Sequence, residues 1–231
     1  MTASPRWEDG SAGDTDYARI GGTYTGYRQP DPRIAERIVR ALGGARTVLN
    51  VGAGAGSYEP VDRLVTAVEP SASMRSTRPA SLAPAIDAVA EDLSFPDDSF
   101  DAAMTTFSVH QWGDLKLGLS EMRRVTTGPI VILTCDPELL ATNTTLDVVP
   151  IPLDCADGFN EAYYGRPEAL LNPSARLACS AWSHVPEAVH ERFARELKAD
   201  LNAGVWDHHH GALRSQAHYE GSLMLITSTA H

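Results

Sequence analysis

Short apolar runs alternate with helical patterns over the first 134 residues. Five runs rich in Val, Ile, Leu and Ala predict strands at 47–51, 64–68, 85–89, 100–106 and 129–134. Residues 31–42 and 114–124 repeat apolar side chains every three or four positions, which predicts helices that begin at Asp31-Pro32 and at Asp114. Strands that alternate with helices indicate an open, mainly parallel α/β sheet with right-handed crossovers.

The pattern changes after Cys135. Five prolines fall between Pro137 and Pro173, and strong periodicity is absent, which indicates a lid or substrate-binding insertion at about 137–185. A helix is predicted from Pro186 to Gly204, and residues 222–227 predict a last strand. We therefore expect a mobile tail at 1–16 and a single domain at 17–231. Its fold would be Rossmann-like, with a seven-stranded or six-stranded sheet and helices on both faces.

Composition limits the possible partners. The 231 residues are enough to bury a full core, and 43% hydrophobic with 21% charged residues is ordinary for a soluble protein. A net charge of -11 disfavours nucleic acid and anionic membranes as partners. The start is polar, no apolar run reaches roughly 18 residues, and the three cysteines form no Cys-x-x-Cys pair. We expect a cytoplasmic monomer or homodimer that acts on a small molecule.

The candidate chemistry lies in residues 47–69. Gly52, Gly54 and Gly56 follow a strand at alternate positions, and glycines there let a ligand approach the backbone closely. Glu69 ends the next strand, where an acid can hold a ribose diol. The spacing lacks the third glycine of a dinucleotide turn, and Pro60 interrupts the short crossover. The stretch predicts an adenosine cofactor without phosphates, which disfavours the alternative of a nicotinamide-dependent oxidoreductase.

Four blocks in order extend this prediction: VLNVGAGAG, VTAVEPSASM, AEDLSFPDDSFDAAMTTFSVHQW and EMRRVTTGPIVIL. Together they resemble the motifs of class I S-adenosylmethionine-dependent methyltransferases, in the branch that contains small-molecule and quinone-type enzymes. The resemblance covers about residues 33–134. It implies transfer of a methyl group from S-adenosyl-L-methionine to an oxygen, nitrogen or carbon atom of a small organic acceptor, in specialised metabolism.

The resemblance also assigns cofactor contacts. The three glycines would pass under the methionine portion, and the Glu69 carboxylate would accept from both ribose hydroxyls. Asn50 and Ala53 are also predicted cofactor contacts. Met74 would pack on the adenine, with ordinary helix packing as the alternative. The family often has Asp at the positions of Asn50 and Val89, so the role of Asn50 is open. The other predicted cofactor contacts are Tyr17, Tyr24, Arg28, Pro70, Ala90, Glu91, Asp92, Thr106 and Phe107, of which Arg28 would pair with the methionine carboxylate.

His110 follows the fourth predicted strand and is the predicted general base or acceptor-orienting group. Alignment of donor and acceptor can suffice without a base. The other predicted acceptor contacts are Trp112, Phe159, Tyr163 and Tyr164. The run His208–His210 is expected to be a polar loop, and no metal site is expected. A non-methylating enzyme and a non-catalytic binding protein of the same fold remain alternatives.

Overall fold

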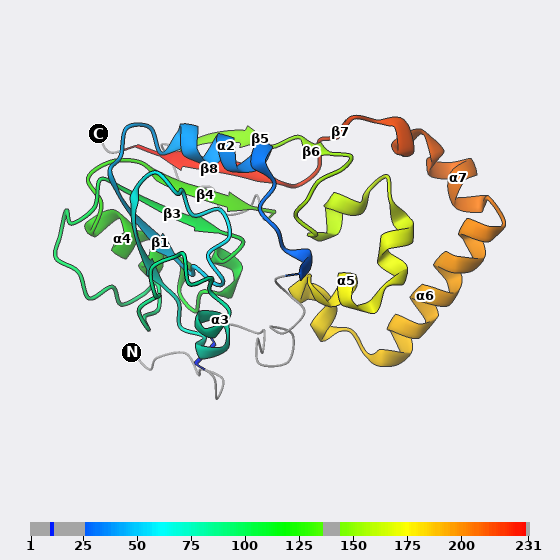
Figure 1. Cartoon of the computed structure of the whole chain (residues 1–231), viewed down its shortest axis with the longest axis horizontal. Coiled ribbons are helices and arrows are strands. Elements are labelled where there is room, and N and C mark those ends of the chain that lie inside the picture. The colour runs from blue at the N-terminus through cyan, green and yellow to red at the C-terminus, as the bar shows by residue number, and fades with distance from the viewer. Residues whose placement is uncertain (1–9, 12–25, 136–143, 230–231) are drawn as a thin grey trace. The chain divides into compact units, whose positions relative to one another are not determined.

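The structure is a computed structural model that describes residues 10–11, 26–135 and 144–229 (Figure 1). Its first unit comprises Met1–Gly21, Pro32–Val149 and Ser222–His231, and its second unit comprises Gly22–Asp31 and Pro150–Gly221. Almost all of the expected tail at 1–16 lies outside the described residues. The long segment of the second unit overlaps the insertion expected at 137–185, whose role as a lid stays a prediction.

A six-stranded sheet forms the centre of the first unit. Its strands, in spatial order, are β2 (Leu64–Val68), β1 (Thr47–Val51), β3 (Ala102–Thr106), β4 (Ile130–Thr134), β8 (Met224–Ser228) and β5 (Thr144–Val148). The first four are parallel neighbours, whereas β8 is antiparallel to both β4 and β5. The expected Rossmann-like, mainly parallel sheet is confirmed, with six strands.

Two details of the sheet differ from the sequence-based prediction. Residues 85–89 form no strand, because only Ile86 pairs with β2, through a single bridge to Val68, and its side chain is exposed. Conversely, β5 lies where no strand was expected. Four of its five residues are exposed and only Leu146 and Val148 are apolar, so the segment lacks the continuous apolar run of a buried parallel strand.

The predicted helices of the first unit are present. Helix α2 (Pro32–Ala41) buries Ile34 and Ile38, and α4 (Leu115–Arg124) buries Met122. Asp114 caps α4, since its carboxylate accepts from the Leu117 N–H at 2.9 Å. Between β1 and β2 the chain, described throughout residues 52–63, forms turns and no helix. The crossover is as short as expected.

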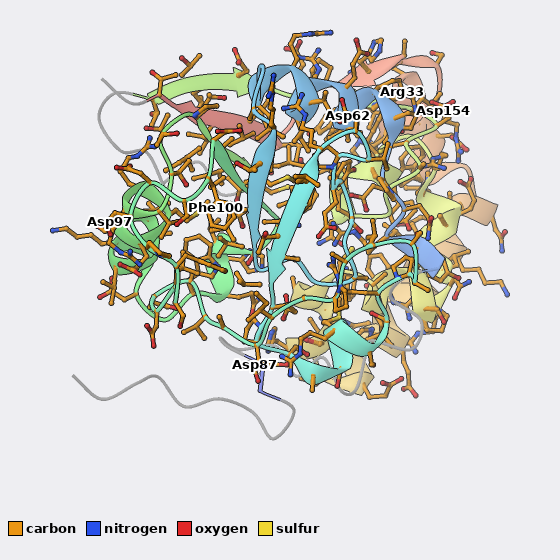
Figure 2. The ribbon with its side chains drawn as sticks, turned by 60° about the vertical axis from the view of Figure 1, so that its left-hand side comes forward. Arg33, Asp62, Asp87, Asp97, Phe100 and Asp154 are labelled. Carbon is orange, nitrogen blue, oxygen red and sulfur yellow. The ribbon has the colours of Figure 1, made fainter. Side chains whose placement is uncertain are left out.

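A buried apolar core packs against the sheet of the first unit. Leu49 and Val68 pack in one buried cluster with Met122 and Phe100, and Phe100 meets Phe95 edge to face at 5.1 Å. In Figure 2, Phe100 turns inward from the loop whose Asp97 lies at the surface. Because β1 pairs in parallel with both β2 and β3, the carboxyl ends of these three strands lie at the same edge of the sheet, where open α/β folds bind ligands.

The second unit is built mainly from short helices. In chain order its elements are β6 (Ile151–Pro152), η3 (Asn160–Tyr163), η4 (Pro167–Leu171), α5 (Pro173–Leu177), η5 (Ser180–His184), α6 (Glu187–Asn202), α7 (Val205–His210), η6 (Gly211–Ser215) and β7 (His218–Tyr219). Figure 1 shows α6 and α7, in orange, curving around the yellow segments that include α5. The two parts of this unit are joined by Arg28, whose Nε contacts Asp157 Oδ1 at 2.5 Å.

The second unit confirms one predicted helix and corrects a predicted loop. Helix α6 begins after Pro186 and is followed by Gly204 at φ +70°. His208–His210 belong to helix α7 rather than to a loop. Contacts between side chains stabilise this short helix. The ring centroids of Trp206 and His210 lie 5.5 Å apart, and Arg214 Cζ lies 4.7 Å from the Trp206 ring centroid. None of the helices in the described residues has the length and apolarity to cross a bilayer.

Candidate cofactor-binding site

The turn at residues 52–56, here called the glycine turn, leaves the carboxyl end of β1. Its glycines have φ angles of +67° at Gly52, +51° at Gly54 and +91° at Gly56. Other residue types pay roughly 1–2 kcal/mol in this left-handed region. A Cβ at Gly52 would lie 1.8 Å from Ser108 Oγ, and one at Gly56 would lie 2.3 Å from Leu82 Cδ1. Both conformation and space therefore demand glycine here.

Glu69 directly follows β2 and reaches the glycine turn, although only 6% of it is exposed. Its Oε2 accepts from the Gly54 N–H at 2.8 Å, and its Oε1 accepts from the Ser71 N–H at 2.9 Å. Burial raises the pKa of Glu69, while these two bonds and nearby Arg75 act in the opposite direction. The predicted acid and the predicted turn are thus in direct contact.

Asn50 lies at one end of a buried polar network. Its Nδ2 donates to Glu59 Oε1 at 3.0 Å, and Glu59 Oε2 accepts from Arg78 Nη2 at 2.9 Å. The amide nitrogen must face Glu59, since two acceptor oxygens would repel each other. Asn50 Oδ1 is consequently a buried acceptor with no hydrogen bond from the described part of the chain.

Met74 and four of the other predicted cofactor contacts have different environments. Met74 is buried on α3 (Ala72–Ser76), and its Cε would lie 3.3 Å from a Cβ at Gly54. Ala90 is buried, and Pro70 is half-buried. Glu91 Oε1 accepts from the Asp114 N–H at 2.9 Å, so that carboxylate helps to hold the start of α4, whereas Asp92 is exposed.

The carboxyl end of β3 adjoins the glycine turn. Thr106 ends the strand, and Phe107 follows it at φ +52°. The Phe107 ring lies 6.5 Å from that of Tyr58, which also has a positive φ, of +65°. Backbone conformations of this kind concentrate at ligand sites. The sequence carried no signal for Tyr58, because nothing in its neighbours marks a left-handed residue.

The same end of β3 carries two of the predicted acceptor contacts. His110 is exposed in the short helix η1 (Val109–Gln111). Trp112 is half-buried, and its Nε1 donates to Ser108 Oγ at 3.0 Å. Ser108 in turn occupies the space beside Gly52. Phe107, Trp112 and the glycine turn are therefore linked through Ser108, while the catalytic role of His110 stays a prediction.

Several predicted site residues belong to the second unit. Arg28 pairs with Asp157, and Phe159 and Tyr163 are buried. Burial raises the pKa of Tyr163 to about 12. Tyr164 donates its hydroxyl to the Gln216 carbonyl at 2.7 Å. Tyr17 and Tyr24 lie outside the described residues, and the ligand roles of all these side chains stay predictions.

The site fits a nucleoside ligand without phosphates. The glycine turn presents backbone without side chains, Glu69 supplies a two-oxygen acceptor, and Asn50 Oδ1 is a buried acceptor with no hydrogen bond from the described residues. A pyrophosphate would instead favour a helix N-terminus after the turn, and residues 52–63 form none. Fold and site together define a Rossmann-like nucleoside-binding protein.

Comparison with known proteins shows a similarity to methyltransferases. Residues 49–128 match the family model for a methyltransferase domain. A crystal structure from Anabaena variabilis, described as that of a methyltransferase from an antibiotic biosynthesis pathway, is 25% identical with a TM-score of 0.80. That match covers 88% of this chain and 99% of the other. No curated protein matches. Residues 49–128 are thus similar to a methyltransferase domain, and the chain shares the fold of the class I methyltransferases, which use S-adenosylmethionine as methyl donor.

More distant solved structures have the same kind of description. A SAM-dependent methyltransferase from Aquifex aeolicus is 20% identical over 56% of this chain and 83% of its own, with a TM-score of 0.43. A type II methyltransferase structure from Anaeromyxobacter dehalogenans is 20% identical over 87% and 94%, with a TM-score of 0.46.

Proposed function

We propose that the chain transfers the methyl group of S-adenosyl-L-methionine to an oxygen, nitrogen or carbon atom of a small organic acceptor in specialised metabolism. The observation that carries the proposal is the contact between Glu69 and the glycine turn, at the edge where β1 and β2 end. The antibiotic-pathway description of the Anabaena variabilis protein supports an acceptor from specialised metabolism. When bound, the cofactor supplies an electrophilic methyl group.

Different residues of the first unit bind different parts of the cofactor. The ionised Glu69 accepts from the ribose hydroxyls, and the glycine turn lets the methionine portion lie against the backbone. Met74 offers an apolar surface to the adenine. Asn50 Oδ1, buried behind the turn, provides an additional acceptor for an N–H donor that approaches the turn.

The proposed role of His110 is to orient the acceptor and to remove its proton. Its exposed position after β3, on the same sheet edge as the glycine turn, supports this role. A neutral imidazole can accept the proton that an O–H or N–H acceptor loses as its methyl bond forms. Phe159, Tyr163 and Tyr164 of the second unit are proposed acceptor contacts, and Arg28 with Tyr17 or Tyr24 is proposed to hold the methionine carboxylate.

The wider setting of the enzyme is also proposed. A chain of net charge -11 is expected to bind a small molecule rather than nucleic acid. We expect it to work in the cytoplasm as a monomer or homodimer. Size-exclusion chromatography with light scattering would test the oligomeric state.

Calorimetric titration with S-adenosylhomocysteine tests the cofactor site without an acceptor. We expect the wild-type chain to bind, Glu69→Ala to lose at least about tenfold in affinity through two lost charge-assisted bonds, and Glu36→Ala to be unchanged. Glu36 is the control because its carboxylate is exposed on α2. Absence of binding in the wild type, or unchanged binding by Glu69→Ala, would refute the proposal.

Methyl transfer itself is measured as S-adenosylhomocysteine released in the presence of a panel of small phenols, amines and carbon acids. With a competent acceptor, we expect His110→Ala to lower kcat about 10²-fold or more while the dissociation constant for S-adenosylhomocysteine stays the same. An unchanged kcat would remove His110 from the proposed mechanism and leave alignment as the source of catalysis.

A further inference from the structure

We propose that Glu59 and Arg78 are positioning residues that hold the glycine turn in its ligand-binding conformation, with Asn50 as their neutral partner. The proposal rests on the proposed function, in which this turn receives the methionine portion of the cofactor. The three residues come from the end of β1, the crossover after it and the segment after α3. They form the Asn50–Glu59–Arg78 network.

Arg78 joins three stretches of chain through one guanidinium. Its Nη1 donates to the Gly54 carbonyl at 3.3 Å, its Nη2 pairs with Glu59, and its Nε and Nη2 donate to the Ala83 carbonyl at 3.2 and 2.9 Å. The side chains of Arg78 and Glu59 are only 3% and 2% exposed. The pair is therefore shielded from water and acts at short range.

Gly54 is the point at which this network and the predicted site meet. The Gly54 N–H donates to Glu69, and the Gly54 carbonyl accepts from Arg78. These two groups belong to the two peptide units on either side of the Gly54 Cα. Each unit is thus held by one charged side chain, and the rotation that glycine would otherwise permit is restricted.

A role in stability alone is a weak explanation for the network. Burying an ion pair costs several kcal/mol of desolvation, and apolar replacements of buried pairs are often neutral or stabilising. Here the remaining hydrogen bonds of the pair join the Gly54 carbonyl of the turn, the Ala83 carbonyl and Asn50. That distribution is the one expected of groups that fix a binding geometry.

The charge of the network explains why an amide stands at position 50. Glu59 has the Asn50 amide nitrogen on one oxygen and Arg78 on the other. An aspartate at position 50 would put two buried carboxylates within hydrogen-bond distance, and such a pair cannot ionise fully. One carboxylate for one guanidinium is the balanced state, and the neutral Asn50 preserves it.

The test compares Asn50→Asp, the double variant Asn50→Asp/Glu59→Gln, and Arg78→Lys. We expect Asn50→Asp to weaken S-adenosylhomocysteine binding about 10-fold to 100-fold, the range that one unpaired buried polar group produces. The double variant has its carboxylate at position 50 and its amide at position 59, so the network again contains one of each. Its affinity should return to within about threefold of wild type. Arg78→Lys keeps the charge but loses the guanidinium fork, and should weaken binding about tenfold.

Two controls separate positioning from stability. Glu36→Gln removes an exposed ion pair with Arg40 and should change nothing. Met122→Ala, on the buried face of α4, should lower the melting temperature without changing the dissociation constant in the folded protein. If the network variants also lower only the melting temperature and bind normally, or if the double variant binds no better than Asn50→Asp, the inference is wrong.

Amide hydrogen exchange in the ligand-free protein gives a second readout. We expect faster exchange over residues 52–56 in Arg78→Lys and Asn50→Asp than in wild type, and equal rates across the segment in Glu36→Gln. A wild-type chain that binds no S-adenosylhomocysteine would refute the proposed function. Unchanged exchange in the variants would refute the positioning role whether or not the ligand binds.

Discussion

Replacing Gly52 by alanine tests the geometry of the glycine turn most directly. The backbone at Gly52 has φ +67°, which costs alanine roughly 1–2 kcal/mol. The added Cβ would also lie 1.8 Å from Ser108 Oγ and 2.7 Å from Ser108 Cβ. Relief of such overpacking typically costs another 1–3 kcal/mol. We expect Gly52→Ala to destabilise the chain by about 2–5 kcal/mol.

Gly43→Ala is the matched control for this substitution. Gly43 follows α2 at φ +58°, and nothing lies within 4 Å of its would-be Cβ. The control therefore retains the backbone strain and the change in unfolded-state entropy, but not the clash. Urea unfolding of both variants, followed by circular dichroism, should show a difference of about 1–3 kcal/mol that reports the Ser108 contact.

A third variant identifies the clashing partner. The double variant Gly52→Ala/Ser108→Gly removes the contacts of the new Cβ with Ser108 Oγ and Cβ, so it should recover most of the stability difference between Gly52→Ala and Gly43→Ala. The recovery should be incomplete, because the hydrogen bond from Trp112 Nε1 to Ser108 Oγ is lost. Gly52→Ala should also weaken S-adenosylhomocysteine binding, because the turn must shift. Equal stability of Gly52→Ala and Gly43→Ala would show that β1 and β3 do not approach as described.

Three further predictions concern other parts of the first unit. Because burial raises the pKa of Glu69 above 4.5, S-adenosylhomocysteine affinity should fall as the pH drops through that raised value, and a pH series by calorimetry should show no such fall in Glu69→Gln. Met122→Ala should cost about 2–5 kcal/mol in urea unfolding, whereas Leu117→Ala on the exposed side of α4 should cost less than about 1 kcal/mol; similar losses would contradict the assigned core. Asp114→Ala should cost about 1 kcal/mol by loss of the α4 cap, with Asp114→Asn close to wild type in the same assay.

The sequence predicted features whose causes are local. The apolar run of β1, the cap at Asp114 and the conformational demand for glycine each arise within a few residues, and the structure contains all three. Glu69 was found because the end of the strand after a glycine turn is a fixed place in this fold, and the Glu69 carboxylate does reach the turn.

The remaining features depend on contacts between distant residues. Glu59 and Arg78 are 19 positions apart, and neither differs in sequence from an ordinary surface charge. Strand β5 is mostly exposed, so only its pairing with β8 reveals it. The sequence of the histidine run is typical of a polar loop, and only the structure shows that Trp206, in helix α7, packs against His210 and Arg214. No pattern of neighbours carries such information.

The second unit is assembled from two separate stretches of chain, and this limits how it can be exchanged between relatives. Residues 22–31 are tied to residues 150–221 by the Arg28–Asp157 pair and by the bond from the Gly158 N–H to the Tyr27 carbonyl. A graft of 150–221 alone would bring a buried Asp157 without its cation, a defect that costs several kcal/mol. Transplanting the proposed acceptor contacts of this unit would therefore require both stretches to move together, as a split module.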